Sequence, residues 1–433
     1  MKNVLLLSCR SPFLDDSKIY APMANLYLKS FINKHLSDVN VVLGDDDYDV
    51  TNLSWIEAYD IIGLSIMTPQ RAEANKLLHA LKKEYPNKLV IAGGPHCKYY
   101  LDDIAREPYD FVVPFDGERP LMQIISGEAR SRIIKDIMSK GDIASAPRPD
   151  RTSEDAIKLL KSYHYKLGGV KATTMMTARG CPELCTFCED ARTTTKWSSL
   201  ENISAELDDI TALGFGGVYI FDDLFAIAQS KVKPIVEEIS RRGMIFRCNG
   251  QAKYFTRDAD EFAKLLAING CVEIAFGFES GSQRILDNVQ KRTTVVQNYL
   301  SVEYAKKWGI KVKAFLMLGL PGENYNSIAE TEQFIRNSGI DDFQLAIYYP
   351  YKGTGIRDAL DKGDRSIDLK VLGEGLGAYG QKGGNTEGVV CTSELSSDDL
   401  LRERDRIVNL YKPKSHEIKW GDKFFDTNLG VLC

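Results

Sequence analysis

The chain lacks the features that mark secreted, membrane-spanning or nucleic-acid-binding proteins. It has 433 residues, and no apolar run approaches the ~20 residues that a membrane span needs. The N-terminal apolar run, Val4 to Leu7, is too short for a secretory signal peptide. The net charge of −5 provides no surplus of positive charge that would attract a nucleic-acid backbone over a broad surface. We therefore predict a cytoplasmic protein that contacts neither membrane nor nucleic acid.

The chain contains few histidines and an odd number of cysteines. Nine cysteines in a chain of cytoplasmic type argue against a disulfide framework. Six of them are scattered, and we interpret these as buried small apolar residues or inert thiols. The other three, Cys181, Cys185 and Cys188, are clustered, and no histidine lies near them in sequence. This cluster therefore needs its own explanation.

The first 130 residues alternate short apolar strands with helical patterns. Such strands are typical of a parallel sheet that is covered on both faces. We predict strands at Val4–Leu7, Val41–Leu43, Ile61–Ile66, Leu89–Ala92 and Phe111–Val113, and helices at Met23–His35, Gln70–Glu84, Tyr99–Ala105 and Arg119–Ser126. This order indicates a doubly wound, flavodoxin-like (Rossmann) domain over residues 1–130. Its ligand would lie beyond the carboxyl ends of the strands.

Three strand ends in this domain carry residues that suit a bound ligand. They are Ser65 and Thr68 after the third strand, Gly93, Gly94 and His96 after the fourth, and Glu118 after the fifth. Glycine allows positive φ and a close approach of the backbone to a large cofactor. Taken alone, each segment is more typical of a tight turn into a helix, and that alternative stays open.

A second β/α region begins near residue 171 and continues to residue 355. We predict strands at Thr174–Thr177, Val218–Phe221, Ile245–Asn249, Glu273–Phe278, Val312–Leu318 and Gln344–Tyr349, and helices at Ser199–Leu213, Lys231–Arg242, Asp258–Ile268, Thr294–Trp308 and Ser327–Asn337. Six repeats fall short of the eight in a closed TIM barrel. The pattern therefore predicts an α/β fold with an open, partial (β/α)6 TIM-type barrel, whose active site lies at the C-terminal strand ends.

Two segments flank this predicted barrel. Residues 131–170 are predicted to be a linker that is stiff near Ala146–Asp150 and then continues as a charged helix. Residues 356–433 are predicted to form a small C-terminal extension, which begins with a glycine-rich stretch. It holds one helix, Ser397–Tyr411, for which Ser397 is the expected N-cap.

The cysteine cluster follows the first strand of the predicted barrel. Gly180 and Pro182 enforce a turn beside Cys181, and the spacing CxxxCxxC brings three thiolates into one loop. Three thiolates can ligate three irons of one [4Fe–4S] cube, and the fourth iron then stays open for a small molecule. A zinc site with a distant fourth ligand, or a redox dithiol of Cys185 and Cys188 alone, remains an alternative from spacing.

Four ordered motifs resemble those of the radical S-adenosylmethionine (SAM) superfamily. They are the CxxxCxxC loop, Phe221-Asp222-Asp223-Leu224-Phe225 at the second strand end, Gly277-Phe278-Glu279-Ser280-Gly281 at the fourth, and Leu318-Gly319-Leu320-Pro321-Gly322-Glu323 at the fifth. The resemblance implies that the open iron binds SAM. Reductive cleavage of SAM would then produce a 5′-deoxyadenosyl radical that takes a hydrogen from the substrate.

The same resemblance implies roles for residues at the strand ends. The candidates are Glu279 and Ser280 for SAM, Gly319, Pro321 and Gly322 for its adenosyl group, Asp222 and Asp223 for SAM or substrate, and Tyr348 for the substrate pocket. Each carboxylate is also a common helix N-cap, and an aromatic at a strand end is also suited to core packing. These structural roles stay open.

A doubly wound domain ahead of such a barrel resembles the cobalamin-binding subfamily of radical SAM enzymes. The strand-end segments Ile62–Thr68, Ala92–His96 and Asp116–Glu118 match its pattern, although Asp116 stands where glycine is common. The chain has no DxHxxG motif, so the resemblance implies a base-off corrin without a histidine–cobalt bond. His96 is the nearest alternative ligand, but its position is more typical of a helix start.

The leading interpretation is a cobalamin-dependent radical SAM methyltransferase that acts on a small molecule or peptide. SAM would serve both as radical source and as methyl donor, and an external donor such as flavodoxin or ferredoxin would supply electrons. A cobalamin-free lyase, dehydratase or isomerase is the second interpretation, in which Ser65, Thr68 and Glu118 have structural roles only. A cobalamin or iron–sulfur sensor is the non-enzymatic alternative. A methylthiotransferase is disfavoured because the chain has no second cysteine cluster.

Overall fold

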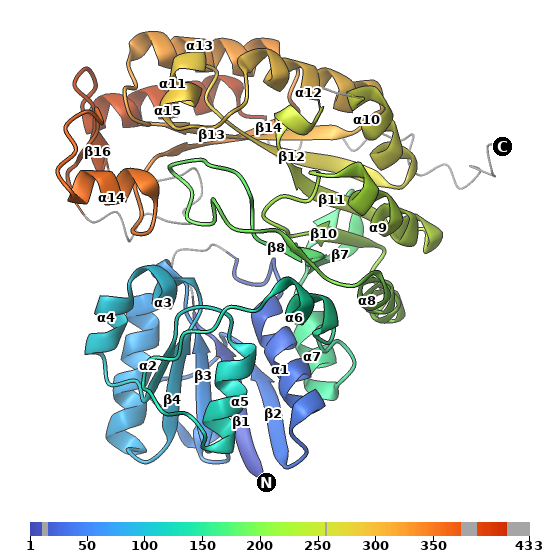
Figure 1. Cartoon of the computed structure of the whole chain (residues 1–433), viewed down its shortest axis with the longest axis vertical. Helices are drawn as coiled ribbons and strands as arrows, with labels where there is room; N and C mark the ends of the chain where they lie inside the picture. The colour runs from blue at the N-terminus through green and yellow to red at the C-terminus, as the bar shows by residue number, and fades with distance from the viewer. Residues whose placement is uncertain (11–15, 256–257, 374–387, 414–433) are drawn as a thin grey trace.

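The computed structural model describes residues 1–10, 16–255, 258–373 and 388–413. Two α/β lobes are stacked along the long axis of the molecule, with the N-terminal lobe in blue below the green-to-red barrel lobe (Figure 1). Parts of the predicted C-terminal extension, including Gly375 to Gly384, lie outside the described residues. Among the described residues, no helix is long and apolar enough to cross a membrane.

The first lobe is built on a five-stranded parallel sheet. Its strands are β1 (Lys2–Ser8), β2 (Val39–Gly44), β3 (Ile61–Ser65), β4 (Leu89–Gly93) and β5 (Phe111–Val113). Their spatial order is β2-β1-β3-β4-β5, which is the flavodoxin-like order and places the topological switch point between β1 and β3. The predicted doubly wound domain is therefore confirmed.

Both faces of this sheet are buried, because successive residues of each strand pack into different cores. Helices α1 (Met23–His35) and α5 (Glu118–Ser126) cover one face, and α2 (Arg71–Glu84), α3 (Pro95–Tyr99) and α4 (Leu101–Arg106) cover the other. On the α1 and α5 face, the sheet carries Gly63 and Gly93 where neighbouring strands carry leucine and valine. These missing side chains leave room between the sheet and the two helices.

The second lobe is an open half-barrel. Its parallel strands are β7 (Val170–Met175), β10 (Gly217–Ile220), β11 (Ile245–Gly250), β12 (Cys271–Glu279), β13 (Lys311–Leu318) and β14 (Asp342–Ile347). They are ordered β14-β13-β12-β11-β10-β7, and a short strand β6 (Lys166–Leu167) adds antiparallel to β7. No hydrogen bonds join β6 to β14 in the described sheet. The partial (β/α)6 barrel predicted from the sequence is therefore confirmed.

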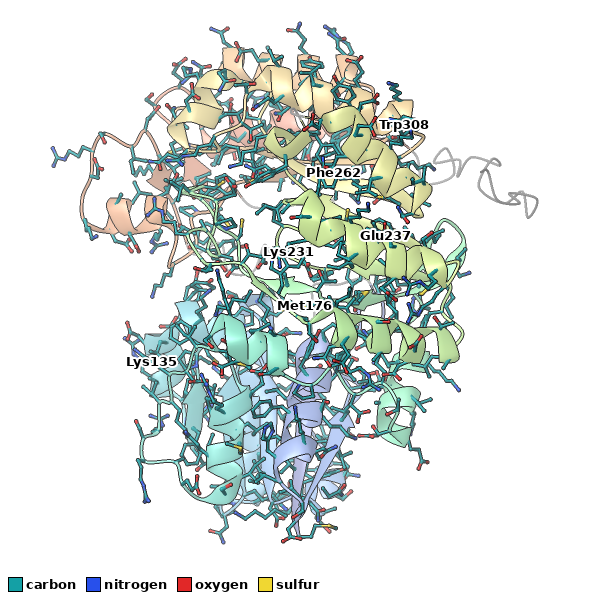
Figure 2. All side chains as sticks on the ribbon, turned by 45° about the vertical axis from the view of Figure 1, so that its right-hand side comes forward. Lys135, Met176, Lys231, Glu237, Phe262 and Trp308 are labelled. Atoms are coloured by element: carbon teal, nitrogen blue, oxygen red, sulfur yellow. The ribbon has the colours of Figure 1, made fainter. Side chains whose placement is uncertain are left out.

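Helices on the outer face of the half-barrel bury its core. They are α8 (Leu200–Ala212), α9 (Gln229–Arg241), α10 (Ala259–Ile268), α11 (Gln283–Asn288), α12 (Val295–Lys307) and α13 (Tyr325–Asn337). Their N-termini are fixed by ordinary caps: for example, the Thr294 hydroxyl accepts the N–H of Gln297 in a capping box at the start of α12. Met176, which directly follows β7, lies at the junction of the two lobes (Figure 2).

The predicted linker packs as part of both lobes. It contains α6 (Lys140–Ser145), the charged helix α7 (Glu154–Ser162) and strand β6 of the barrel sheet. Arg151, between the two helices, is 1% exposed and pairs with Glu206 of α8 at 2.7 Å. Its guanidinium also donates to the Thr174 carbonyl of β7 at 2.6 Å. The segment of residues 131–170 therefore lies between the two lobes and contacts both.

The described part of the C-terminal extension contacts the half-barrel at two places: the Ile356 N–H of its first helix donates to the Thr186 carbonyl of the cysteine loop, and its last helix lies at the β14 edge. It contains α14 (Gly355–Asp361), the small hairpin of β15 (Lys370–Val371) and β16 (Val390–Cys391), and α15 (Ser397–Tyr411). Helix α15 packs against α13 and β14. Its bounds match the prediction, but Ser396 is the N-cap, since its hydroxyl accepts the N–H of Asp399. The expected cap at Ser397 was wrong by one residue.

Candidate active site

The three clustered cysteines lie in the loop between β7 and α8. This loop opens with a hairpin of β8 (Ala178–Arg179) and β9 (Lys196–Trp197). Gly180 has a φ of 92°, and a Cβ at this position would lie 2.8 Å from the Thr194 carbonyl oxygen. Only glycine fits that turn. The Cys181 N–H then donates to Thr193 Oγ1 at 2.8 Å, so the first cysteine is held by the returning strand of the loop.

The spread of the three thiols suits a cluster better than a single ion. Cys185 is buried, and Cys181 and Cys188 are half-buried. Among the described residues, the only three metal-ligating atoms that all lie within 4.8 Å of one another belong to three neighbouring aspartates. Thiolates around one zinc ion would stand about 3.8 Å apart, as follows from tetrahedral Zn–S bonds of about 2.3 Å. The three thiols do not all lie within 4.8 Å of one another, which is wider than the spacing around one zinc ion.

Burial controls the protonation of these thiols. It raises the pKa of the Cys181 thiol to about 11 and that of the Cys188 thiol to about 12. Metal ligation requires thiolates, so the loop would release protons when it takes up a metal.

A cavity of about 700 Å³ opens beside the cysteine loop. Its lining includes the three cysteines, Asp223, Asn249, Gly250, Gln251, Ala275, Gly277, Glu279, Lys291 and Phe315. The carboxyl ends of β10, β11, β12 and β13 thus converge on the loop, as expected for a barrel active site. The side-chain carbonyl oxygen of Gln251 is buried here and has no hydrogen-bond partner within the protein. It can accept a hydrogen bond from a ligand.

Glu279 is the strained residue of this cavity. It ends β12 with a φ of 64°, a conformation that favours glycine. Its carboxylate occupies the space beside Gly277, where a Cβ would lie 2.4 Å from Oε1. It pairs with Lys291 Nζ at 2.7 Å, and both residues are 7% exposed. Burial lowers the pKa of Lys291, but Glu279 outweighs this, so the lysine pKa is raised and its charge is kept.

We expect Glu279→Gln to destabilise the chain by about 3 kcal/mol, because it leaves the Lys291 ammonium buried without a counter-charge. Urea unfolding of the cluster-free chain measures this loss. The matched control is Asp260→Asn, which removes the partner of Lys307 from a surface pair with side chains 39% and 55% exposed. That control should change stability little. Equal losses in the two variants would contradict the prediction.

The neighbouring aspartates Asp222 and Asp223 have different surroundings. Asp222 is 1% exposed, and its carboxylate accepts the N–H of Thr177 at 2.7 Å and the Thr177 hydroxyl at 2.5 Å. Asp223 lines the cavity and accepts the N–H of Gly180 at 2.9 Å. Neither is a helix N-cap, since α9 is preceded by Ala228. Asp222 therefore fixes the start of the cysteine loop, and Asp223 is the one that faces the cavity.

Burial raises the pKa of Asp222 to about 7 from its ordinary value of 3.8. The folded chain then binds a proton that the unfolded chain has released, so folding stability falls as pH rises from about 4 to about 7. Asp222→Asn keeps an acceptor for Thr177 and does not titrate. We expect the melting temperature of the variant minus that of wild type to be higher at pH 8 than at pH 5. Calorimetry of the cluster-free chains measures this, and a pH-independent difference would contradict it.

Two of the predicted site residues are in the core. Ser280 is fully buried, and its hydroxyl lies 3.1 Å from the Thr331 hydroxyl. Tyr348 is 3% exposed and belongs to the main core of the barrel. Neither residue lines the cavity beside the cysteines. Their predicted contacts with SAM and substrate stay predictions.

The turn after β13 packs against the C-terminal extension. Gly319 has a φ of 86°, and a Cβ there would lie 3.1 Å from Leu400 of α15. The carbonyl of Pro321 accepts the side-chain N–H of Asn288 at 3.0 Å, and Gly322 has a φ of 80°. None of the three predicted residues of this turn lines the cavity beside the cysteines. Their predicted approach to an adenosyl group stays a prediction.

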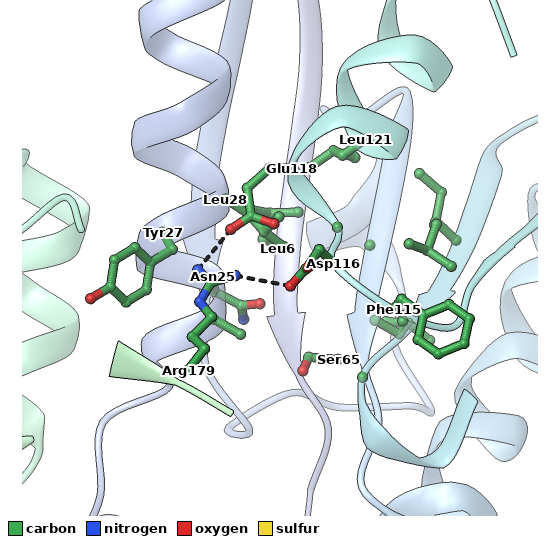
Figure 3. A pocket seen from close by; sticks show the side chains of 18 of the residues that line it. Leu6, Asn25, Tyr27, Leu28, Ser65, Phe115, Asp116, Glu118, Leu121 and Arg179 are labelled. Carbon is green, nitrogen blue, oxygen red and sulfur yellow. Dashed lines mark hydrogen bonds and ion pairs between the residues drawn. The ribbon is translucent and has the colours of Figure 1, made fainter. Parts of the chain in front are cut away.

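A second cavity, of about 950 Å³, lies at the switch point of the first lobe. Figure 3 shows it between β1, α1 and the start of α5. Four of the predicted cofactor residues line it: Ser65, Gly93, Gly94 and Glu118. Apolar side chains such as Leu6 and Leu28 complete most of the wall. The cavity is therefore a largely apolar slot with a polar rim, which suits a large cofactor with an apolar part.

The other two predicted residues of this domain lie outside that lining. His96 is 1% exposed and stacks on Tyr100 with ring centroids 5.0 Å apart. Its Nδ1 lies 3.3 Å from the Thr68 hydroxyl. Burial, followed by the charge of Arg71, lowers the pKa of His96 to about 4, so the ring is neutral. The structure brings Thr68 and His96 together at the start of α3, outside the lining of the slot.

Other lining residues carried little or no signal of a site in the sequence. Asn25 and Tyr27 come from α1, which reads as an ordinary amphipathic helix. Arg179 crosses from the barrel to Asp116 and Glu118, at 3.1 and 2.8 Å (dashed lines in Figure 3). Its place two residues before the first cysteine was the only available signal. The first cavity is therefore lined in part by the segment that leads into the cysteine loop of the second lobe.

Comparison with known proteins identifies both lobes. A profile of the radical SAM superfamily matches residues 175–335, and a profile of the B12 binding domain matches residues 27–125. The chain belongs to the radical SAM superfamily. The cofactors of this radical SAM protein are a [4Fe–4S] cluster and SAM, and its first lobe is a cobalamin-binding domain.

Related sequences agree with this assignment. This radical SAM protein is 27% identical over 354 residues to an uncharacterized methyltransferase of Pyrococcus horikoshii, with 77% of each chain covered. It is 24% identical over 316 residues to an anaerobic magnesium-protoporphyrin IX monomethyl ester cyclase of Rubrivivax gelatinosus, with 67% of this chain and 57% of the cyclase covered. Several curated methyltransferases are thus similar to the chain at low identity.

Solved structures share the two-lobe fold. The cobalamin-dependent SAM radical enzyme OxsB, with aqua-cobalamin bound, aligns with a TM-score of 0.72 and 16% identity, over 94% of this chain and 66% of that one. The radical SAM methyltransferase TsrM of Kitasatospora setae aligns with a TM-score of 0.65 and 17% identity, over 86% and 81%. At these identities the likeness supports the fold alone, and it confirms a first lobe followed by a partial barrel.

Proposed function

We propose that this protein is a cobalamin-dependent radical SAM methyltransferase that transfers a methyl group to a carbon of a small molecule or peptide. One observation carries the proposal: a single segment, Met176 to Cys188, lines both cavities. A corrin in the first cavity and a cluster in the second would therefore share one wall. When bound, the cluster and SAM supply a hydrogen-abstracting radical, and cobalamin supplies a carrier for the methyl group.

The cavity beside the cysteines offers suitable partners for SAM. Cys181, Cys185 and Cys188 would hold the cluster. The Gln251 side-chain carbonyl is an unsatisfied acceptor, which suits the amino group of an amino acid. Lys291 donates to Glu279 and is a cation at the cavity wall, which suits a carboxylate. Asp223 is an exposed acceptor at the mouth and would face ribose hydroxyls or substrate.

The cavity of the first lobe offers suitable partners for cobalamin. Its slot between sheet and helices exists because Gly63 and Gly93 lack side chains on that face. A planar benzimidazole base on the nucleotide tail of the cofactor would fill such a slot. No histidine is among the described residues that line it, and His96 is buried elsewhere. We therefore propose that cobalamin binds base-off, without a histidine ligand to cobalt.

The substrate is proposed to lie between the two cavities. Phe221 at the end of β10 is 44% exposed, and Tyr20 from the first lobe is 42% exposed, although both are large aromatic residues. Their ring centroids lie 5.6 Å apart. Such a pair offers a face to a flat or apolar portion of a substrate. An external donor such as flavodoxin or ferredoxin is proposed to supply the electron.

The test uses the full chain reconstituted with iron and sulfide, incubated with cobalamin, and reduced with dithionite before SAM is added. We expect it to retain about one equivalent of cobalamin after gel filtration. We also expect it to cleave SAM to 5′-deoxyadenosine, and to move deuterium from S-trideuteriomethyl SAM into the cobalamin fraction, as measured by mass spectrometry. A chain that cleaves SAM but neither retains cobalamin nor labels it would instead be a cobalamin-free lyase or isomerase. A chain that retains cobalamin but never cleaves SAM would instead be a sensor.

A further inference from the structure

The first lobe contacts the cysteine loop at both of its ends. Before the cysteines, Arg179 pairs with Asp116 at 3.1 Å and with Glu118 at 2.8 Å. After them, Asp190 pairs with Lys98 of α3 at 2.9 Å. The next residue of α3, Tyr99, donates its hydroxyl to the carbonyl of Glu189 at 3.1 Å. The loop that carries the thiols is thus held from outside the barrel on two sides.

The residues that make these contacts belong to the strand ends around the first cavity. Asp116 and Glu118 line it, and so does Arg179 itself. Lys98 and Tyr99 lie in α3, which begins directly after the lining residue Gly94. A ligand that fills this cavity therefore lies against Arg179 and its two partners, and against Gly94, the residue that precedes α3.

Hydrogen bonds inside the barrel hold the backbone between Arg179 and the first cysteine. The adjacent Gly180 N–H is bonded to Asp223, and the Cys181 N–H is bonded to Thr193. Arg179 also packs its guanidinium over the ring of Tyr27, 5.3 Å from the ring centroid. Its side chain is 26% exposed, so the ion pairs are shielded from water on most sides. A shift of the guanidinium therefore shifts the first cysteine, two residues along the chain.

We infer that the first lobe clamps the cysteine loop at both ends, through Arg179 and through Lys98 with Tyr99, so that a corrin in the cavity strengthens metal retention in the loop. This inference rests on the proposed function for the identity of the corrin. Because binding linkage is reciprocal, a metal in the loop strengthens corrin binding by the same factor. Arg179 is thus a positioning residue that acts on both cofactor sites.

The experiment measures loss of iron from the reconstituted full chain to a chelator, with and without cyanocobalamin, in the absence of SAM and reductant. We expect cyanocobalamin to slow iron release from wild type by about fivefold or more, which is the lower range of typical allosteric coupling. In Arg179→Gln this protection should fall to less than about twofold, and release without corrin should be faster than in wild type. A loss of fold is checked by circular dichroism.

The matched control is Arg119→Gln. Arg119 lies one residue after Glu118 and pairs with Asp136 at 2.8 Å and Asp142 at 3.0 Å, within the first lobe and its connector. Within the described part of the chain it forms no ion pair or hydrogen bond with the barrel, so its variant should keep the wild-type protection. A charge exchange, Arg179→Glu with Glu118→Arg, should recover part of the protection that either single change removes. A role of Arg179 in folding alone would not produce that recovery.

The outcomes separate the clamp from the proposed function. If cyanocobalamin binds wild type but does not slow iron release, or if Arg179→Gln keeps the full protection, the clamp is overturned and the proposed function stands. If cyanocobalamin does not bind at all, the proposed cofactor role fails. The clamp is then decided by iron release without corrin: faster release in Arg179→Gln than in Arg119→Gln supports it, and equal release overturns it.

Discussion

Replacing Cys181, Cys185 and Cys188 together by alanine is expected to abolish both iron binding and SAM cleavage while leaving the fold intact. The three thiols are the only clustered sulfur ligands in the chain, and their loop lies over a cavity rather than inside the core. Even changes next to metal ligands cost 10–100-fold, so the loss of all three ligands should lower 5′-deoxyadenosine formation by more than about 100-fold. Iron content and chromatography of the product measure the two effects.

The control for this variant is Cys391→Ala. Cys391 is half-buried like Cys181 and Cys188, but it lies in the β15–β16 hairpin of the C-terminal extension. Its variant should keep wild-type iron content and SAM cleavage. A triple variant that still holds four irons and cleaves SAM would remove the cysteine loop from the reaction and with it the basis of the proposed function.

Gly93→Leu is expected to abolish cobalamin binding while the cluster is retained. Gly93 ends β4 and lines the slot, its backbone lies outside the left-handed region, and a Cβ there would approach nothing closer than 3.7 Å. The strand therefore tolerates a side chain, and the added leucine fills the space that the corrin tail needs. We expect the dissociation constant to rise by about 100-fold or more, which corresponds to about 3 kcal/mol of lost contact and added clash.

Equilibrium dialysis with cyanocobalamin measures this change. The iron content of the variant shows whether the cluster is retained. Gly141→Leu adds the same side chain to α6, where the nearest neighbouring atom of a Cβ is the Ser139 hydroxyl at 3.7 Å, away from both cavities. That control should bind cobalamin as wild type does. Normal binding by Gly93→Leu would show that the slot is not where the cofactor lies. Gly94 is unsuitable for this test, because its φ is 94° and any side chain would strain the backbone.

Strand and helix positions were largely predictable because burial on both sheet faces leaves a strong apolar signal. Helix α1 has the predicted bounds, and most strands match within one or two residues. The first barrel strand was placed late, at Thr174–Thr177 instead of Val170–Met175, because threonines and a lysine weaken the apolar signal of its first half. The predicted helix Tyr99–Ala105 is two short helices, since the backbone breaks at Tyr100 with a φ of −120°.

The candidate site was predictable only where a motif lies on one loop. The cysteine spacing, Asp223 and Glu279 lead to one cavity because strand ends of a parallel sheet converge. The contacts of Arg179 with Asp116 and Glu118 join residues 63 and 61 positions apart, and no local pattern predicts such pairs. His96 had the right position in sequence, but the turn at Gly94 directs it into the core beside Tyr100.

The buried guanidinium of Arg151 has a consequence for how this protein can be divided. It pairs with Glu206 of the barrel and contacts the Met23 sulfur of the first lobe at 3.3 Å, with both charged side chains at most 2% exposed. Separating the lobes would leave a charge buried without its partner, which costs about 3–5 kcal/mol. We therefore expect the two lobes to unfold together. A barrel cut out at residue 171 would carry an orphaned carboxylate in its core, so neither lobe is a transplantable module.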